Sequence, residues 1–181
     1  MILTKKADPD IFMFVDGAAS QQQDIGAYAT LLVTANNENR KLLMGTQCPT
    51  TISRMELIPI IEGLRWLRSN WAKRNRMTVR VYSDSEYTVK TLCGLYPKQK
   101  NTELWAAIDD VAEYFNMQYM WRERNTLPQT EVVDAVCSNL RRANKALLNE
   151  YFGDYLNPVG VVPIMPLPTE GETEANEHET E

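Results

Sequence analysis

Short apolar runs separated by turn-forming residues divide the first third of the chain into three predicted strands. Residues 11–15 are wholly apolar and are followed by an Asp-Gly pair, as expected for a strand that is covered on both faces. Residues 26–34 are rich in β-forming side chains, and the polar run 36–39 separates them from a further stretch at residues 41–46. The pattern predicts an antiparallel meander of three strands.

Residues 51–67 have the spacing of an amphipathic helix, which we expect to end near Asn75. Glu56 lies at the start of its apolar stripe, which continues through Pro59, Ile60, Gly63 and Leu67. An ionised carboxylate that faces the protein interior is costly unless it is paired with a cation or bound to a metal. Glu56 is therefore a candidate functional residue, although most single helical glutamates are simply solvated.

The remainder of the chain alternates between strand and helix patterns. Residues 77–83 predict a fourth strand that ends just before Asp84, residues 85–95 and 102–115 predict helices, and residues 117–122 predict a fifth strand. Thr130 is expected to cap a long helix that reaches Tyr151. The order βββαβααβα describes an α/β domain with a five-stranded mixed sheet, three antiparallel strands and then two parallel ones, flanked by helices.

Composition separates a body from a tail. The 181 residues allow one domain, which we place at residues 1–155, followed by a proline-rich apolar linker at 156–169 and an acidic tail at 170–181 that should be disordered. Without the tail, residues 1–169 carry 18 acidic and 19 basic residues, which is compatible with a nucleic-acid partner. The apolar stretch 157–168 can dock on the body or on a protein partner, so the segment 157–181 is a candidate for binding a partner. The acidic end either keeps the protein soluble or competes with nucleic acid for the basic surface.

Cysteine usage and hydropathy indicate the cellular compartment that we expect for the protein. Cys48, Cys93 and Cys137 are widely spaced, without zinc-like pairing, and are typical of reduced thiols. No stretch has the apolar length of a membrane span, and the first residues lack the layout of a signal peptide. We therefore expect a cytoplasmic monomer with no membrane association.

Four acidic residues fall where this fold would bring them together. Asp16 and Asp84 each follow an apolar strand, and two such strands lying parallel at the centre of a sheet end at the same edge, where open α/β sheets bind ligands. Glu56 on the crossover helix and Asp134 in the first turn of the last helix can join them. Four carboxylates repel one another unless divalent cations neutralise them, and an oxygen-only donor set favours Mg²⁺ or Mn²⁺, two per site. Taken singly, Asp16 also suits a turn, Asp84 a helix cap and Asp134 the dipole of a helix N-terminus. Taken together, the four acids favour a metal site.

At these positions the chain resembles type 1 ribonuclease H, a member of the RNase H-like superfamily. The matching segments are Phe14-Val-Asp-Gly-Ala, Ile25-Gly-Ala-Tyr-Ala, Arg54-Met-Glu-Leu, Tyr82-Ser-Asp-Ser-Glu-Tyr and Leu104-Trp, followed by Trp121, Pro128 and Asp134. The resemblance implies hydrolysis of the RNA strand of an RNA/DNA hybrid, with Asp16, Glu56, Asp84 and Asp134 as both the catalytic and the metal-binding residues. It also implies that substrate contacts come from Thr51, Ser53, Arg54, Glu86, Trp105 and Arg124.

Several positions depart from the family pattern. Ile52 and Ser53 replace asparagines that read the minor groove in bacterial relatives, and Glu86 replaces a glutamine. Arg124 lies in the loop where the family often has a catalytic histidine, and a guanidinium cannot shuttle a proton at neutral pH. The basic insertion after the second helix is absent, so substrate contacts must come from Lys98, Lys100, Arg54 or Trp105, or from another chain. Trp105 is equally compatible with a core position.

Two other classes of function remain compatible with these residues. One is a nuclease of the same fold that acts on another nucleic acid, which the missing asparagines favour. The other is a non-catalytic nucleic-acid-binding or scaffold module, which the four acids disfavour.

Overall fold

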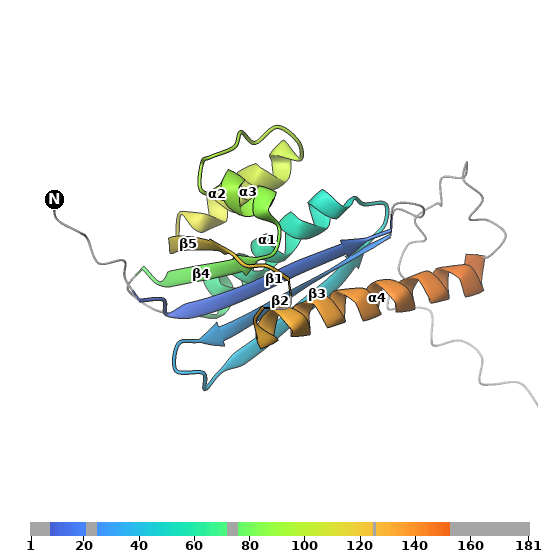
Figure 1. Cartoon of the computed structure of the whole chain (residues 1–181), viewed down its shortest axis with the longest axis horizontal. Coiled ribbons are helices and arrows are strands. Elements are labelled where there is room, and N and C mark those ends of the chain that lie inside the picture. The colour runs from blue at the N-terminus through green and yellow to red at the C-terminus, as the bar shows by residue number, and fades with distance from the viewer. Residues whose placement is uncertain (1–7, 21–24, 72–75, 125, 153–181) are drawn as a thin grey trace, which may run out of the picture.

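The structure is a computed structural model that describes residues 8–20, 25–71, 76–124 and 126–152. Its elements are β1 (Ile11–Ala19), β2 (Gly26–Thr34), β3 (Arg40–Gln47), α1 (Ile52–Asn70), β4 (Thr78–Ser83), α2 (Glu86–Leu92), α3 (Thr102–Ala112), β5 (Asn116–Trp121) and α4 (Pro128–Phe152). The strands form one sheet in the order β3-β2-β1-β4-β5 (Figure 1). This confirms the predicted order of elements and the mixed sheet.

The pairing of β1 determines where the candidate site lies. On one side β1 pairs antiparallel with β2 along its whole length, from the partners Ile11 and Thr34 to Ala19 and Gly26. On the other side it pairs parallel with β4, and this ladder ends at Phe14 and Tyr82. Beyond Phe14, β1 is therefore open on its β4 side.

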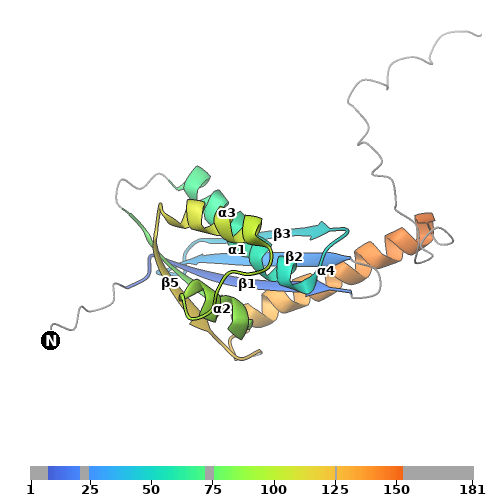
Figure 2. The ribbon, with the colours of Figure 1, turned by 90° about the horizontal axis from the view of Figure 1, so that it is seen from above.

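Helices cover both faces of this sheet, as Figure 2 shows from above. α1 and α3 pack on one face, over a core that includes Met13 and Leu64. α4 packs on the other face, over Phe14 and Val133. Since side chains alternate along a strand, β1 contributes to both cores.

The structure corrects several predicted boundaries. Asp16 does not follow a strand but lies inside β1, because β2 continues the ladder beyond Asp16. α1 ends at Asn70 rather than near Asn75, since its last buried residue is Leu67 and the Asn70 amide donates to the Trp66 carbonyl at 2.9 Å. α2 and α3 each end three residues early, at Leu92 and Ala112.

α4 also begins earlier than predicted. Its first residue is Pro128, a favourable residue at a first helical position because it has no N–H to leave unpaired. Thr130 is therefore inside the helix and not its N-cap, and its hydroxyl donates to the Leu127 carbonyl at 2.7 Å. The predicted domain end at residue 155, the linker 156–169 and the acidic tail 170–181 lie outside the described residues. None of the helices in the described ranges is both long and apolar enough to cross a bilayer.

Candidate active site

The register of β1 and β4 brings two of the predicted acids together. Asp16 follows Phe14 by two residues and Asp84 follows Tyr82 by two residues, and Phe14 and Tyr82 are the last partners of the parallel ladder. The rings of Phe14 and Tyr82 stack on the α4 face with centroids 5.1 Å apart. By strand alternation the Asp16 side chain points toward the same face.

The environment of Asp16 disfavours its charge. Its side chain is buried, and its Oδ2 atom has no hydrogen-bond partner among the described residues. Burial, followed by the charges of Asp84 and Asp134, raises the pKa of Asp16 to about 7. A group in this position is stabilised by a cation, because a cation removes both the repulsion and the unsatisfied oxygen.

Asp134 joins this group from α4, but not as the sequence predicted. Because α4 begins at Pro128, Asp134 lies in the second helical turn, where the helix dipole contributes little. Its carboxylate instead forms an ion pair with the guanidinium of Arg124. The hydrogen bond to Asp134 raises the pKa of Arg124, and the charges of Asp16 and Asp84 also raise it. Arg124 therefore lies in the field of all three aspartates.

Glu56 approaches from the other side of the sheet, at the start of α1. Its Oε2 atom accepts hydrogen bonds from the hydroxyls of Ser85, at 2.7 Å, and Thr88, at 3.2 Å. Ser85 is also the N-cap of α2, where its Oγ atom accepts from the Thr88 N–H. One hydroxyl next to Asp84 in sequence thus fixes both the Glu56 carboxylate and the start of α2.

A close approach of backbones holds α1 against β1 at this point. A Cβ atom added to Gly17 would lie 2.2 Å from the Met55 carbonyl oxygen and 2.8 Å from the Glu56 nitrogen. Only glycine allows this separation. On the opposite side of β1, the buried Cys137 thiol donates to the Asp16 carbonyl at 3.3 Å and fixes α4.

The four carboxylates are of the chemical type that binds a divalent cation, but they are not arranged as a closed metal cage. Within the described ranges, no three carboxylate, thiol or imidazole groups converge closely enough to enclose a metal ion as they stand. Asp134 is turned to Arg124 and Glu56 to Ser85 and Thr88. The donors are all carboxylates, which Mg²⁺ and Mn²⁺ prefer, and the unpaired oxygen of Asp16 is available to such an ion.

A pocket of about 340 Å³ adjoins Glu56 between α1, α2 and the start of α3. Its polar lining includes Ser53, Lys100 and Asn101. Trp105 also borders it, but the side chain is only 2 % exposed and its indole donates to the Lys100 carbonyl at 2.9 Å. Of the two interpretations of Trp105, the structure favours the core position over a stacking platform.

The other predicted substrate residues occupy different settings. Arg54 forms an ion pair with Glu103 of α3 and also donates to Asn101 at 3.5 Å, so it connects the starts of α1 and α3. Glu86 is exposed and pairs with Lys90 one turn along α2. Thr51 is the N-cap position of α1, without a side-chain capping bond, and is exposed, as is Ile52.

Sequence reasoning missed the residues that hold the carboxylates in place, namely Gly17, Ser85, Thr88 and Cys137. The Ser85-x-x-Thr88 spacing at a helix start is a capping signal, but no sequence pattern connects it with Glu56, 29 residues earlier.

This sheet order, with carboxylates at the end of the central parallel pair, defines an RNase H-like fold. The chain belongs to the RNase H family, whose model matches residues 8–137. Ribonuclease H of Cupriavidus pinatubonensis is 29% identical over 143 residues, which cover 71% of this chain and 93% of that protein.

Solved structures share the same fold. The N-terminal RNase H domain of a Mycobacterium tuberculosis protein superposes with a TM-score of 0.66 at 16% identity, over 75% of this chain and 96% of that domain. LC11-RNase H1, isolated from compost and solved in complex with an RNA/DNA hybrid, superposes with a TM-score of 0.60 at 20% identity. The match covers 68% of this chain and 92% of that one. At these identities the two structures bear on the fold alone.

Proposed function

We propose that the protein hydrolyses the RNA strand of RNA/DNA hybrids and that Asp16, Glu56, Asp84 and Asp134 are its catalytic carboxylates. The observation that carries the proposal is the buried Asp16 carboxylate, which faces two further aspartates and whose pKa is raised to about 7. Membership of the RNase H family supports the reaction type. The hybrid bound by LC11-RNase H1 supports the choice of substrate.

The same four residues would hold two divalent cations, Mg²⁺ or Mn²⁺. Bound in this way, the ions would activate a water molecule for attack on the phosphodiester and stabilise the leaving 3′ oxygen. The part of this chain is to keep the carboxylates in position: Ser85 and Thr88 restrain Glu56, and the β1–β4 register aligns Asp16 with Asp84.

Arg124 acts by charge in this proposal. Its guanidinium stays protonated at neutral pH, so it cannot replace a histidine as a proton carrier. It pairs with Asp134 in the absence of substrate, and a phosphate oxygen of the substrate is an alternative partner of the same charge.

Substrate binding is proposed for the pocket beside Glu56. Lys100 is an exposed cation on its rim, and Ser53 and Asn101 offer hydrogen-bond donors. Arg54 acts there as a positioning residue, because its ion pair with Glu103 and its contact with Asn101 connect the starts of α1 and α3.

A nuclease that acts on another nucleic acid is the second candidate. Ile52, at the exposed start of α1, has no side-chain group that can read 2′-hydroxyls, and the neighbouring Ser53 is shorter than asparagine. This weakens the expected discrimination between hybrid and RNA duplex without removing the carboxylates.

Cleavage of a matched RNA/DNA hybrid, an RNA duplex and a DNA duplex tests the proposal. Each duplex is incubated with the full chain in Mg²⁺, Mn²⁺ or EDTA at one stated salt concentration, because phosphate contacts are salt-dependent. We expect cleavage of the hybrid's RNA strand with either metal and none in EDTA. Preferential cleavage of either other duplex would support the second candidate, and no cleavage of any duplex would contradict both.

We also propose that the protein works as a monomer in the cytoplasm. Cys93 and Cys137 are free thiols, which fits a reducing compartment.

A further inference from the structure

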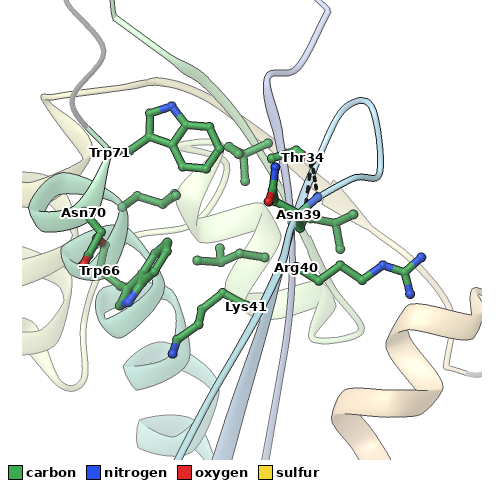
Figure 3. A pocket seen from close by; sticks show the side chains of 11 residues that line it. Thr34, Asn39, Arg40, Lys41, Trp66, Asn70 and Trp71 are labelled. Carbon is green, nitrogen blue, oxygen red and sulfur yellow. Dashed lines mark hydrogen bonds between the residues drawn. The ribbon is translucent and has the colours of Figure 1, made fainter.

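A second pocket lies at the opposite end of β1, on the α1 face of the sheet. It has a volume of about 530 Å³ and lies between the last turn of α1, the end of β2 and the start of β3 (Figure 3). Ile11, which lines it, precedes Asp16 by five residues of strand, or about 16 Å at ~3.3 Å per residue. The pocket is therefore separate from the candidate active site.

The interior of this pocket is apolar and aromatic. Ile11, Leu32 and Leu67 form its base, and each is at most 3 % exposed. The indoles of Trp66 and Trp71 form the α1 wall, as Figure 3 shows, and both are partly exposed. Two indoles beside an apolar base offer a surface on which a flat ring can stack.

The wall formed by β3 presents one cation to the pocket. Lys41 is paired with Leu32 of the pocket base, so its side chain lies on the α1 face. Arg40 is instead paired with Val33 of the α4-face core. The Arg40 side chain accordingly extends away from the indoles, as Figure 3 shows. The Lys41 ammonium lies 5.8 Å from the centre of the Trp66 ring. None of the eleven described lining residues is acidic. An occupant with negative charge at this wall is therefore favoured.

The end of α1 orients such an occupant. Asn70 and Trp71 lie at the C-terminus of the helix, where the carbonyl end of the helix dipole disfavours an anion. The negative charge of an occupant is consequently favoured near Lys41, and a flat ring is favoured near the indoles. Amides of Asn39 and Asn70 on the rim can bond to the polar edge of the ring.

We propose that this pocket binds a nucleotide, with the base stacked against Trp66 or Trp71 and the phosphate held by Lys41. Aromatic side chains interleaved with cations bind unpaired nucleotides in this way, because every base presents a π-face and every nucleotide a phosphate. The nucleotide is either free in solution or an unpaired residue of a nucleic-acid strand. The proposal does not depend on the catalytic role of the four acids.

Indole resonances of the full-length protein test the site directly. The chain has four tryptophans, and the Nε1 of Trp121 donates to the Asp84 carbonyl beside the candidate active site. AMP is titrated in EDTA, which removes divalent ions and prevents cleavage. We expect saturable shifts of the Trp66 and Trp71 signals and none of Trp121. Shifts confined to Trp121, or no saturable shift, would overturn the proposal.

Charge reversal provides the matched comparison. Lys41→Glu should weaken AMP binding about tenfold or more, because it places a like charge beside the phosphate. Arg40→Glu makes the same charge change at the neighbouring residue, whose side chain lies on the other face of the sheet, and should leave the affinity near that of the wild type. Arg65→Glu makes this change at an exposed position outside the pocket, with the same expected result. Equal losses in all three variants would reduce the effect to general electrostatics and overturn the assigned site.

A six-residue oligodeoxyadenylate distinguishes the two sources of the nucleotide. Tighter binding than AMP at the Trp66 and Trp71 signals, lost in Lys41→Glu, identifies an unpaired strand as the ligand. Binding no tighter than that of AMP identifies the free nucleotide. An oligonucleotide that leaves both signals unshifted while AMP shifts them restricts the pocket to free nucleotides.

Discussion

Gly17→Ala should inactivate the enzyme far more than it destabilises the fold. The added Cβ would lie 2.2 Å from the Met55 carbonyl oxygen and 2.3 Å from the Met55 carbonyl carbon. Both are backbone atoms, so no side-chain rotation relieves the overlap. Restoring a carbon–carbon contact of about 3.5 Å requires β1 and the start of α1 to separate by roughly 1 Å.

This separation moves Glu56 relative to Asp16. Overpacking of this kind costs about 1–3 kcal/mol of stability, whereas a ~1 Å misplacement of catalytic groups costs about 100-fold in rate. We expect kcat for hybrid cleavage in Mg²⁺ to fall about 100-fold. The melting temperature should fall by only about 4–8 °C for a loss of ~2 kcal/mol in a chain of this length.

Gly94→Ala is the matched control. Gly94 has φ of +76° and no atom within 4 Å of an added Cβ, so alanine costs stability through backbone strain of about 1–2 kcal/mol without moving a neighbour. Its cleavage rate should remain near that of the wild type. Full activity in a folded Gly17→Ala protein, or an equal loss in Gly94→Ala, would refute the reasoning.

Three further predictions test separate parts of the site. The Asp16 carboxyl binds its proton more tightly in the folded than in the unfolded protein. The free energy of unfolding of the wild type in EDTA should therefore fall by up to ~4 kcal/mol as the pH rises from about 4 to 7. Denaturation of the Asp16→Asn variant should not show this loss. Ser85→Ala should reduce kcat about tenfold and the free energy of unfolding by about 1 kcal/mol, because Glu56 loses a hydrogen bond and α2 loses its N-cap. Rescue by Ser85→Thr would show that the hydroxyl, and not packing, is responsible. Ile52→Asn with Ser53→Asn should raise the ratio of kcat/KM for hybrid over RNA duplex, and an unchanged ratio would place discrimination elsewhere.

The sequence predicted the order of elements because turn-forming or charged residues separate its apolar runs. It could not reveal that Asp16 lies within β1, since this depends on β2 pairing further along β1 than β4 does. It also could not decide the role of Trp105. Its position suits both a platform and the core, and only the packing against α1 and the bond to Lys100 distinguish them.

The sequence singles out the four acids because the pattern puts each near the end of a predicted element or on an apolar stripe, and their catalytic and metal-binding roles stay predictions. The groups that restrain them were not predictable, since serine, threonine and cysteine carry no periodic signal and act across the fold. Asp134 shows the same limit: its placement in the first turn was wrong, because Pro128 rather than Thr130 begins α4, and its partner is Arg124.

The pocket beside Trp66 was equally invisible to sequence reasoning. Its aromatic wall comes from α1 and its basic wall from β3, and neither segment alone has the composition of a binding site. Lys41 acquires its significance only when the sheet places it beside Trp66 of α1 (Figure 3).

Hybrid cleavage by Asp84→Asn in Mg²⁺ tests the central claim most directly. The substitution removes one negative charge from the group formed with Asp16 while keeping size and shape, so the fold, followed by circular dichroism and melting, should persist. We predict a loss of at least about 100-fold in kcat, as expected when an electrostatic contribution to the transition state is removed. Asp110→Asn, at an exposed position on α3, makes the same change away from the site and should cleave normally. A folded Asp84→Asn protein that cleaves the hybrid at the wild-type rate would contradict the assignment of these carboxylates.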